Sequence, residues 1–229
     1  MCEQFVARSA RPFRIDSLYP FTAGLERYGI AGFGWGAAWL GPSGSLVSHR
    51  DVRAFRDDPG RRALGDIETT SLLVHLRRPS RMSTLTLADT QPFGDPAGRF
   101  AFSHNGDLRH YQAQRAAYRA AGRILGRADT EVGARWLEDA WQPGTSVPGL
   151  LGSLHGEFDG QANMAVLAQD GSAYHYAGND ENPVFRFQLG EVEIASTGIY
   201  SLDRSLFKLV VPEGAERRRL ALRETAVLA

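Results

Sequence analysis

The segment Cys2-Glu3-Gln4-Phe5-Val6-Ala7-Arg8 opens the chain directly after Met1, and we expect it to form a strand. A strand at this point would hold the beginning of the chain inside a sheet. Cys2 is the only cysteine in the sequence. Once a methionine aminopeptidase removes Met1, Cys2 becomes the first residue, and it then carries both a thiol and a free α-amine.

This pairing of groups on Cys2 has a chemical use. An N-terminal α-amine titrates near neutral pH, so a large fraction of it can act as a base there. A nucleophile with a terminal amine as its base is a recognised solution to amide cleavage. The alternative is that Cys2 stands at this position by chance, so the interpretation depends on the residues further along the chain.

Length and composition limit the classes of protein. The chain has 229 residues, 43% hydrophobic and 23% charged, which suits a single globular domain over residues 1–229. The formal net charge is zero, so no general field attracts nucleic acid or an anionic membrane. Residues 2–30 contain no apolar signal-peptide region, and no run approaches the roughly 18 apolar residues of a membrane span. We therefore expect a cytoplasmic protein with no nucleic-acid or membrane partner.

Metal and cofactor signals are weak. A single cysteine builds neither a disulfide framework nor a CxxC metal site. The histidines His75, His104, His110 and His155 show no helix-face pairing of the kind that binds zinc. We therefore predict no metal ion and no cofactor.

Strand-like and helix-like segments alternate unevenly along the chain. Two helices are expected at residues 111–124 and 129–141, where Asp129 and Glu131 supply the acidic residues favoured at a helix start. Asn105-Gly106 is a strong turn signal and is expected to end a strand. Further strands are expected at residues 71–77, 100–104, 162–168, 173–177, 184–189 and 192–196. The order of strands, helices and strands favours an α+β or layered-sheet fold over a parallel βαβ fold.

Several short motifs occur together in a characteristic order. Cys2 is followed by His75-Leu76-Arg77, by Ser103-His104-Asn105-Gly106 and by Asp129-Thr130-Glu131. In this order and spacing they resemble the glutaminase domain of class II glutamine amidotransferases, which are N-terminal-nucleophile hydrolases. The segments Gly34-Trp35-Gly36 and Thr90-Gln91-Pro92-Phe93 are also similar to that family, especially to its small free-standing members. The resemblance extends from Cys2 to about Leu202.

The resemblance implies a fold and a set of roles. The fold is a four-layer αββα sandwich of two mainly antiparallel sheets between helices. Cys2 would be the nucleophile, and the Asn105 side chain with the Gly106 backbone N–H would stabilise the oxyanion. Arg77 and Asp129 would bind the α-carboxylate and the α-ammonium of glutamine, which are groups that a guanidinium fork and a carboxylate recognise.

Two positions depart from the family pattern. Ala128 stands where many relatives have Ser before the acidic motif, and Gln91 stands where relatives often have His. Loss of the hydroxyl at residue 128 weakens the case for a strict preference for free glutamine. The expected activity is therefore hydrolysis of the γ-amide of glutamine or of a larger γ-glutamyl amide.

Three functional interpretations remain open. The enzyme could release ammonia for a separate synthase, because only about 25 residues follow the glutaminase region. It could instead be a free-standing hydrolase of a γ-glutamyl amide in a biosynthetic intermediate, as in ergothioneine assembly. The third alternative is a non-catalytic binding module in which Cys2 is retained for structure. Taken alone, Asn105-Gly106 could also be only a hairpin turn, and Arg77 and Arg78 an ordinary solvated pair.

Overall fold

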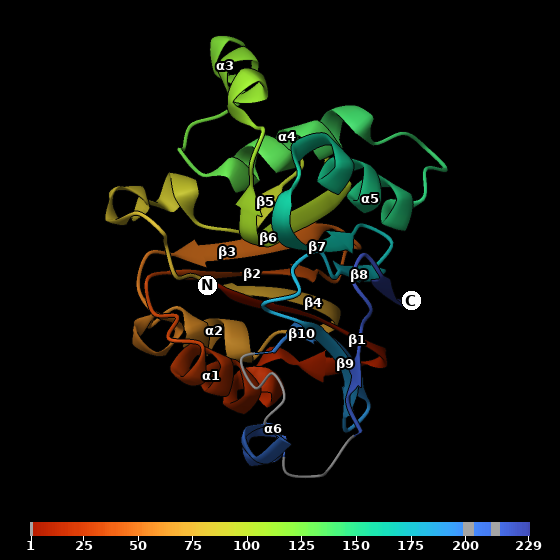
Figure 1. Cartoon of the computed structure of the whole chain (residues 1–229). Coiled ribbons are helices and arrows are strands. Elements are labelled where there is room, and N and C mark those ends of the chain that lie inside the picture. Colours follow the sequence, from red (N-terminus) through yellow and green to blue (C-terminus); the bar gives the residue numbers. More distant parts are fainter. Residues whose placement is uncertain (1, 199–203, 212–215) are drawn as a thin grey trace.

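Two antiparallel β-sheets lie face to face between two helical layers in the computed structural model, which describes residues 2–198, 204–211 and 216–229 (Figure 1). The seven-stranded sheet has the order β11-β9-β10-β1-β4-β2-β3, and the five-stranded sheet has the order β12-β8-β7-β6-β5. Neighbouring strands pair antiparallel in both sheets. The α+β, four-layer αββα prediction is therefore confirmed.

The strands are divided between the two sheets. The larger sheet contains β1 (Glu3–Arg14), β2 (Trp35–Leu40), β3 (Leu46–Asp51), β4 (Glu68–Leu76), β9 (Val184–Leu189), β10 (Val192–Thr197) and β11 (Arg218–Arg219). The smaller sheet contains β5 (Phe93–Gly94), β6 (Phe100–Leu108), β7 (Gly160–Ala168), β8 (Ala173–Tyr176) and β12 (Thr225–Leu228).

Helices cover both outer faces (Figure 1). The larger sheet is covered by α1 (Tyr19–Tyr28), α2 (Arg61–Gly65) and α6 (Arg204–Val210), and the smaller sheet by α4 (Asp129–Ala140) and α5 (Val147–Phe158). Helix α3 (Gln112–Ala120) projects beyond α4. Short 3-10 turns are η1 (Ile15–Leu18), η2 (Phe55–Asp57), η3 (Met82–Thr84) and η4 (Leu87–Asp89). None of the described helices is long and apolar enough to cross a membrane.

Strand β1 lies in the middle of the larger sheet, and its first five residues, 3–7, are buried on both faces. Successive side chains of a strand point to opposite faces, so Phe5 and Ala7 pack against the helical layer of α1. Val6 points the other way and packs between the sheets with small residues such as Ala101 and Ala165. Small side chains at this interface let the two sheets approach closely.

A buried hydrogen-bond bridge links β1 to the opposite sheet through Gln4, which is completely buried. The Ser103 hydroxyl of β6 donates to Oε1 of Gln4 over 2.7 Å. Nε2 of Gln4 donates to the carbonyl oxygen of Asn163 in β7 over 3.1 Å. The beginning of the chain is therefore fixed to both sheets, as the prediction of an N-terminal strand required.

The turn predicted at Asn105-Gly106 is wrong. Strand β6 continues to Leu108, and Asn105 and Gly106 pair with Asn163 and Ala162 of β7. Gly106 has a φ of +128°, and a Cβ there would lie 1.6 Å from the carbonyl oxygen of Gln161. A glycine is therefore needed here because the backbones of β6 and β7 lie in close contact. From the sequence alone, an Asn-Gly pair in a strand of this kind looks the same as an Asn-Gly pair in a hairpin turn.

The other predicted elements agree more closely. Helix α4 begins at Asp129 as predicted, and the strands expected in the last third correspond to β7, β8, β9 and β10. Helix α3 ends at Ala120, earlier than the predicted residue 124. The last residues of the family resemblance, 199–202, lie outside the described residues.

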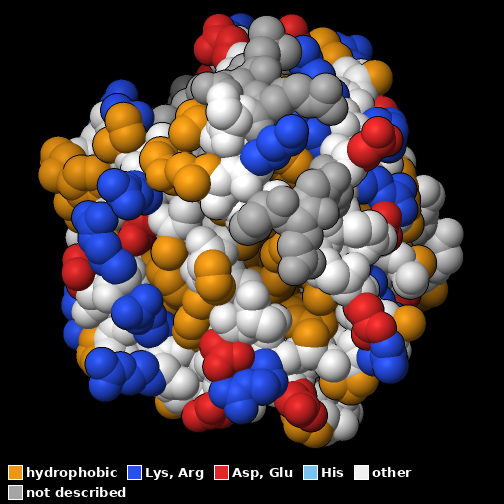
Figure 2. Space-filling view, turned by 90° about the horizontal axis from the view of Figure 1, so that it is seen from below, with side chains coloured by type: hydrophobic (Ala, Val, Ile, Leu, Met, Phe, Trp, Pro, Cys, Tyr) orange, Lys and Arg blue, Asp and Glu red, His pale blue; other side chains and the backbone are white. Residues whose placement is uncertain are grey.

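The face below the larger sheet carries charges of both signs. In Figure 2, Lys and Arg side chains and Asp and Glu side chains both occur around the rim of this face, with hydrophobic side chains nearer its centre. This mixture agrees with the formal net charge of zero.

Glu3 in β1 is expected to make the stability of the fold depend on pH. Glu3 is 3% exposed, and burial raises the pKa of its carboxyl to about 7, against hydrogen bonds from Thr197 and Asn182. The folded state favours the neutral carboxyl. The contribution of Glu3 to the free energy of unfolding is therefore complete below about pH 4.5 and is lost as the pH rises to about 7. The stability of Glu3→Gln relative to wild type should therefore increase by about 3 kcal/mol across this window. Urea denaturation at a series of pH values measures it.

The exposed Glu157→Gln variant is the matched control for Glu3→Gln and should follow the wild-type pH curve. A constant stability difference between Glu3→Gln and wild type from pH 4.5 to 7.5 would contradict this account of Glu3.

Gly106→Ala is expected to destabilise the fold by about 3 kcal/mol or more, because a side chain there combines an unfavourable φ with a clash against strand β7. Gly98→Ala is the control: its φ is +74°, with no atom within 4 Å of an added Cβ. Backbone strain alone should cost that variant about 1 kcal/mol. Equal losses in thermal or urea unfolding would show that the contact with Gln161 is unimportant.

Candidate active site

Cys2, directly before the first residue of β1, lines a cavity of about 800 Å³. The other walls come from the segment after β4, from Asp89 and Gln91, from the end of β6 with Tyr111, and from the start of α4. The backbone N–H of Arg78 donates to Sγ of Cys2 over 3.3 Å. Burial raises the pKa of the Cys2 thiol, whereas this hydrogen bond and the charge of Arg77 act in the opposite direction.

Arg77 lies at the end of β4 and lines the same cavity. It is 5% exposed, and burial lowers the pKa of its guanidinium, although an arginine remains protonated in proteins. Its Nη2 donates to the Thr84 hydroxyl over 2.8 Å. Its Nη1 is buried without a hydrogen-bond partner among the described residues. A buried guanidinium nitrogen without a partner is costly, so this group is suited to receive an anionic ligand.

Asp129 is the first residue of α4, and its carboxylate also lines the cavity. One oxygen accepts from the backbone N–H of Thr130 over 2.9 Å and the other from that of Leu108 over 2.8 Å. These bonds fix the carboxylate between α4 and the end of β6. A carboxylate has about four lone-pair positions, so it can still accept hydrogen bonds from a ligand.

The Asn105 side chain contacts the backbone of Cys2. Its Nδ2 donates to the backbone carbonyl oxygen of Cys2, and its Oδ1 accepts from Nδ2 of Asn182 over 3.4 Å. Asn105 is completely buried, whereas Gly106 lines the cavity. The predicted pair is therefore adjacent to Cys2, and one N–H of Asn105 is already used to position that residue.

A second hydrogen-bond network supports the part of the cavity wall formed by Gln91, His104 and Thr130. Gln91 accepts from the backbone N–H of His104 over 2.6 Å and donates to the Thr130 hydroxyl over 3.1 Å. Nδ1 of His104 lies 3.2 Å from the same hydroxyl. His104 is buried, which lowers its pKa. Gln91 therefore joins β6 to α4 at the position where many relatives of the predicted family have His.

Sequence reasoning missed several residues of this site. The Thr84 hydroxyl accepts a hydrogen bond from Arg77, and the Thr130 hydroxyl contacts the side chains of Gln91 and His104. Asn182, in the loop before β9, donates to Asn105. Thr84 and Asn182 are common polar residues outside the quoted motifs. Thr130 stands within Asp129-Thr130-Glu131, but the sequence assigned its side chain no role, so only the tertiary structure shows these contacts. Trp35 and Trp39 pack in the core beneath the larger sheet.

Comparison with known proteins identifies the family. A model of the glutamine amidotransferases class-II matches residues 1–149, which is more than half of the chain. No curated protein matches significantly. The fold is similar to a glutamine phosphoribosylpyrophosphate amidotransferase from B. subtilis, with TM-score 0.74 and 16% identity over 99% of this chain and 47% of that one. A structure described as the allosteric regulatory enzyme of purine biosynthesis gives TM-score 0.76 and 14% identity over 99% and 46%.

A third similar structure has a comparable length. It is a glutamine aminotransferase class-II domain protein from Silicibacter pomeroyi, with TM-score 0.62, 16% identity and coverage of 98% and 94%. By contrast, the chain spans about half the length of the first two structures. The sequence match over residues 1–149 and the shared sandwich fold agree with each other: this chain belongs to the class II glutamine amidotransferase family.

Proposed function

We propose that this protein hydrolyses the γ-amide of glutamine or of a γ-glutamyl amide, with Cys2 as the nucleophile. The observation that carries the proposal is the meeting of three groups around one cavity: the Cys2 thiol, the Nη1 of buried Arg77, unpartnered among the described residues, and the fixed carboxylate of Asp129. A thiol, a cation and an anion in this arrangement match the γ-carbonyl, α-carboxylate and α-ammonium of a glutamyl group.

The first chemical step uses the α-amine that removal of Met1 exposes. This amine takes the thiol proton as sulfur attacks the γ-carbonyl carbon, and a C–S bond forms. Negative charge develops on the carbonyl oxygen, which the Gly106 backbone N–H and the second N–H of the Asn105 amide would stabilise. The C–N bond then breaks, and the α-ammonium returns a proton to the leaving ammonia or amine.

Hydrolysis completes the cycle. Water adds to the thioester carbon, the C–S bond breaks, and glutamate leaves with the thiol restored. Ammonia would pass to a separate synthase if the substrate is free glutamine. A cytoplasmic location, which the sequence predicts, would keep the thiol reduced, and the single domain over residues 1–229 likewise remains a prediction.

An electrophilic glutamine analogue should add one covalent mass to the peptide that begins at Cys2, and glutamine should protect against it. Cys2→Ala should abolish both the adduct and the release of ammonia. Asn105→Ala should slow turnover by roughly 10²–10³ through loss of an oxyanion donor. Intact-mass and peptide mass spectrometry, with an ammonia assay, measure these outcomes.

The same experiment distinguishes the non-catalytic alternative. If purified protein retains Met1, takes up no label and releases neither ammonia nor amine, the binding-module interpretation replaces the proposed enzyme. Turnover that persists in Cys2→Ala would exclude Cys2 as the nucleophile.

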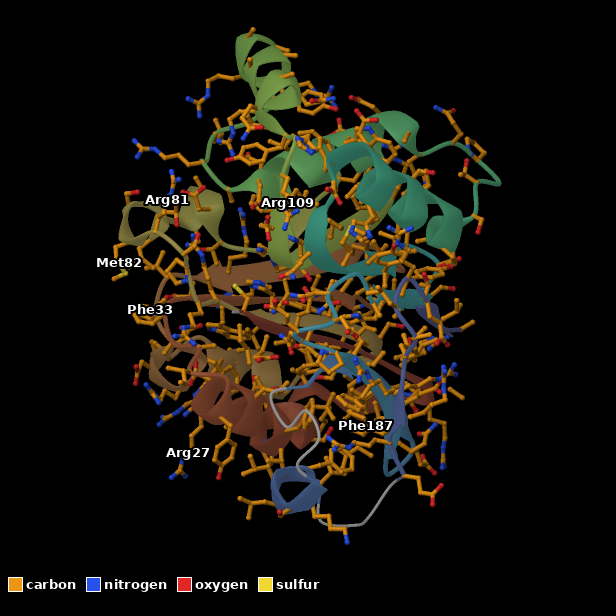
Figure 3. All side chains as sticks on the ribbon, in the orientation of Figure 1. Arg27, Phe33, Arg81, Met82, Arg109 and Phe187 are labelled. Atoms are coloured by element: carbon orange, nitrogen blue, oxygen red, sulfur yellow. The ribbon has the colours of Figure 1, made fainter. Side chains whose placement is uncertain are left out.

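Arg77→Lys should weaken the use of glutamine although it keeps the positive charge. An ammonium cannot present the two parallel N–H groups of a guanidinium to a carboxylate, so we expect kcat/KM to fall about tenfold or more. Arg27→Lys on α1, an exposed residue that is not part of the cavity lining, is the control and should behave as wild type (Figure 3). Equal kcat/KM for wild type and Arg77→Lys would remove Arg77 from the binding site.

A further inference from the structure

Three arginines of the active-site cavity have no side-chain partner among the described residues. Arg78 and Arg81 lie on the segment after β4, and Arg127 lies just before α4. All three are exposed. Within the described part of the chain, their guanidinium groups make no hydrogen bond or ion pair. In Figure 3, Arg81 extends from the loop after β4, and Arg27 lies apart from it on α1.

The remaining charges of the cavity have partners within the protein. Arg109 lies 3.5 Å from the carboxylate of Asp107. One oxygen of Asp89 accepts from the backbone N–H groups of Arg127 and Ala128, and Asp129 accepts from two further backbone N–H groups. The described lining of the cavity holds five arginines against three aspartates, so positive charge is in excess. None of the three carboxylates forms an ion pair with the side chain of Arg78, Arg81 or Arg127 within the described residues.

The size of the cavity indicates that a glutamyl group does not fill it. Ligand pockets of about 300–1,000 Å³ hold drug-sized molecules, and this cavity has about 800 Å³. The charges of a glutamyl group are already matched by Arg77 and Asp129 in the proposed function. Any charge that meets the three remaining arginines must therefore belong to the part of the substrate attached through the amide nitrogen.

We propose that the amide-nitrogen side of the substrate carries a carboxylate or phosphate group, which Arg78, Arg81 and Arg127 bind. Guanidinium groups match the geometry of both anions. This inference rests on the proposed hydrolysis at Cys2 and narrows its substrate to anionic γ-glutamyl amides. Arg78 lies directly beside the nucleophile, since its backbone N–H contacts Sγ of Cys2. A small molecule inside the cavity is therefore favoured over an acidic protein on the outer surface.

The test compares amides that share the glutamyl group and differ in charge at the far end. Neutral γ-glutamyl anilide is the reference, and its para-carboxylate, para-phosphate and para-aminomethyl derivatives are the charged probes. Wild-type protein should cleave at least one anionic probe about tenfold more efficiently than the anilide, measured as kcat/KM, and the cationic probe less efficiently. The preference should decrease at high salt, because exposed charges are screened. Comparing kcat/KM for the para-carboxylate and para-phosphate probes shows which of the two anions the site prefers.

Variants test whether the arginines cause the preference. Single Arg81→Ala and Arg127→Ala replacements should lower the anionic-to-neutral ratio about two- to fivefold each, as expected for exposed ion pairs. Arg81→Glu should shift the preference toward the cationic probe, which a merely structural role would not produce. Arg27→Ala, at an exposed position on α1 outside the cavity lining, should leave the ratio unchanged.

The outcomes separate this inference from the proposed function. Absence of cleavage and of Cys2 labelling with every probe would overturn the proposed function and the inference together. Cleavage with equal kcat/KM for neutral and anionic probes, or with a ratio that Arg81→Glu does not change, would overturn the inference alone.

Discussion

The position of Cys2, the proposed nucleophile, depends on the burial of Gln4 between the two sheets. Its side chain accepts from Ser103 and donates to the carbonyl oxygen of Asn163, so one residue of β1 is tied to both β6 and β7. A buried polar group without partners costs about 1–3 kcal/mol, and a one-residue slip would turn Gln4 to the other face of its strand. The bridge therefore fixes the register of β1 and, two residues earlier, the place of Cys2.

Strand pairing then brings the other parts of the site to the same edge. Glu3 pairs with Leu76 in β4, so Arg77 and Arg78 leave β4 beside Cys2. The bridge to Ser103 aligns β6, whose next residues include Asn105 and Gly106. Asp129 begins the helix that packs on β6 and binds the backbone at its end. Side chains far apart in sequence thus meet because β1 begins where β4 and β6 end.

The order of strands and helices was sufficient for the α+β class, and the family resemblance implied the four-layer sandwich. Cys2, Arg77, Gly106 and Asp129, which stand in the quoted motifs, do line one cavity, whereas their chemical roles stay predictions. The sequence was insufficient where local patterns conflict with tertiary contacts. Asn105-Gly106 has the composition of a turn, yet pairing with β7 continues the strand. Helix α5 contains Pro148 and three glycines, which obscure its apolar spacing. Hydrogen bonds such as Thr84 to Arg77 join ordinary polar residues, so no spacing predicts them.

The electrostatics of the cavity bear on when the thiol would lose its proton. Burial raises the pKa of Cys2, and the charge of Arg77 is one of the influences that oppose this rise. If the substrate carboxylate binds Arg77, as we propose, it neutralises that charge before attack begins. A thiolate formed in the empty cavity would then lose part of its stabilisation on substrate binding. Proton transfer to the α-amine during attack avoids this conflict, and for this reason a base on the nucleophilic residue itself suits the site better than a permanently ionised thiol.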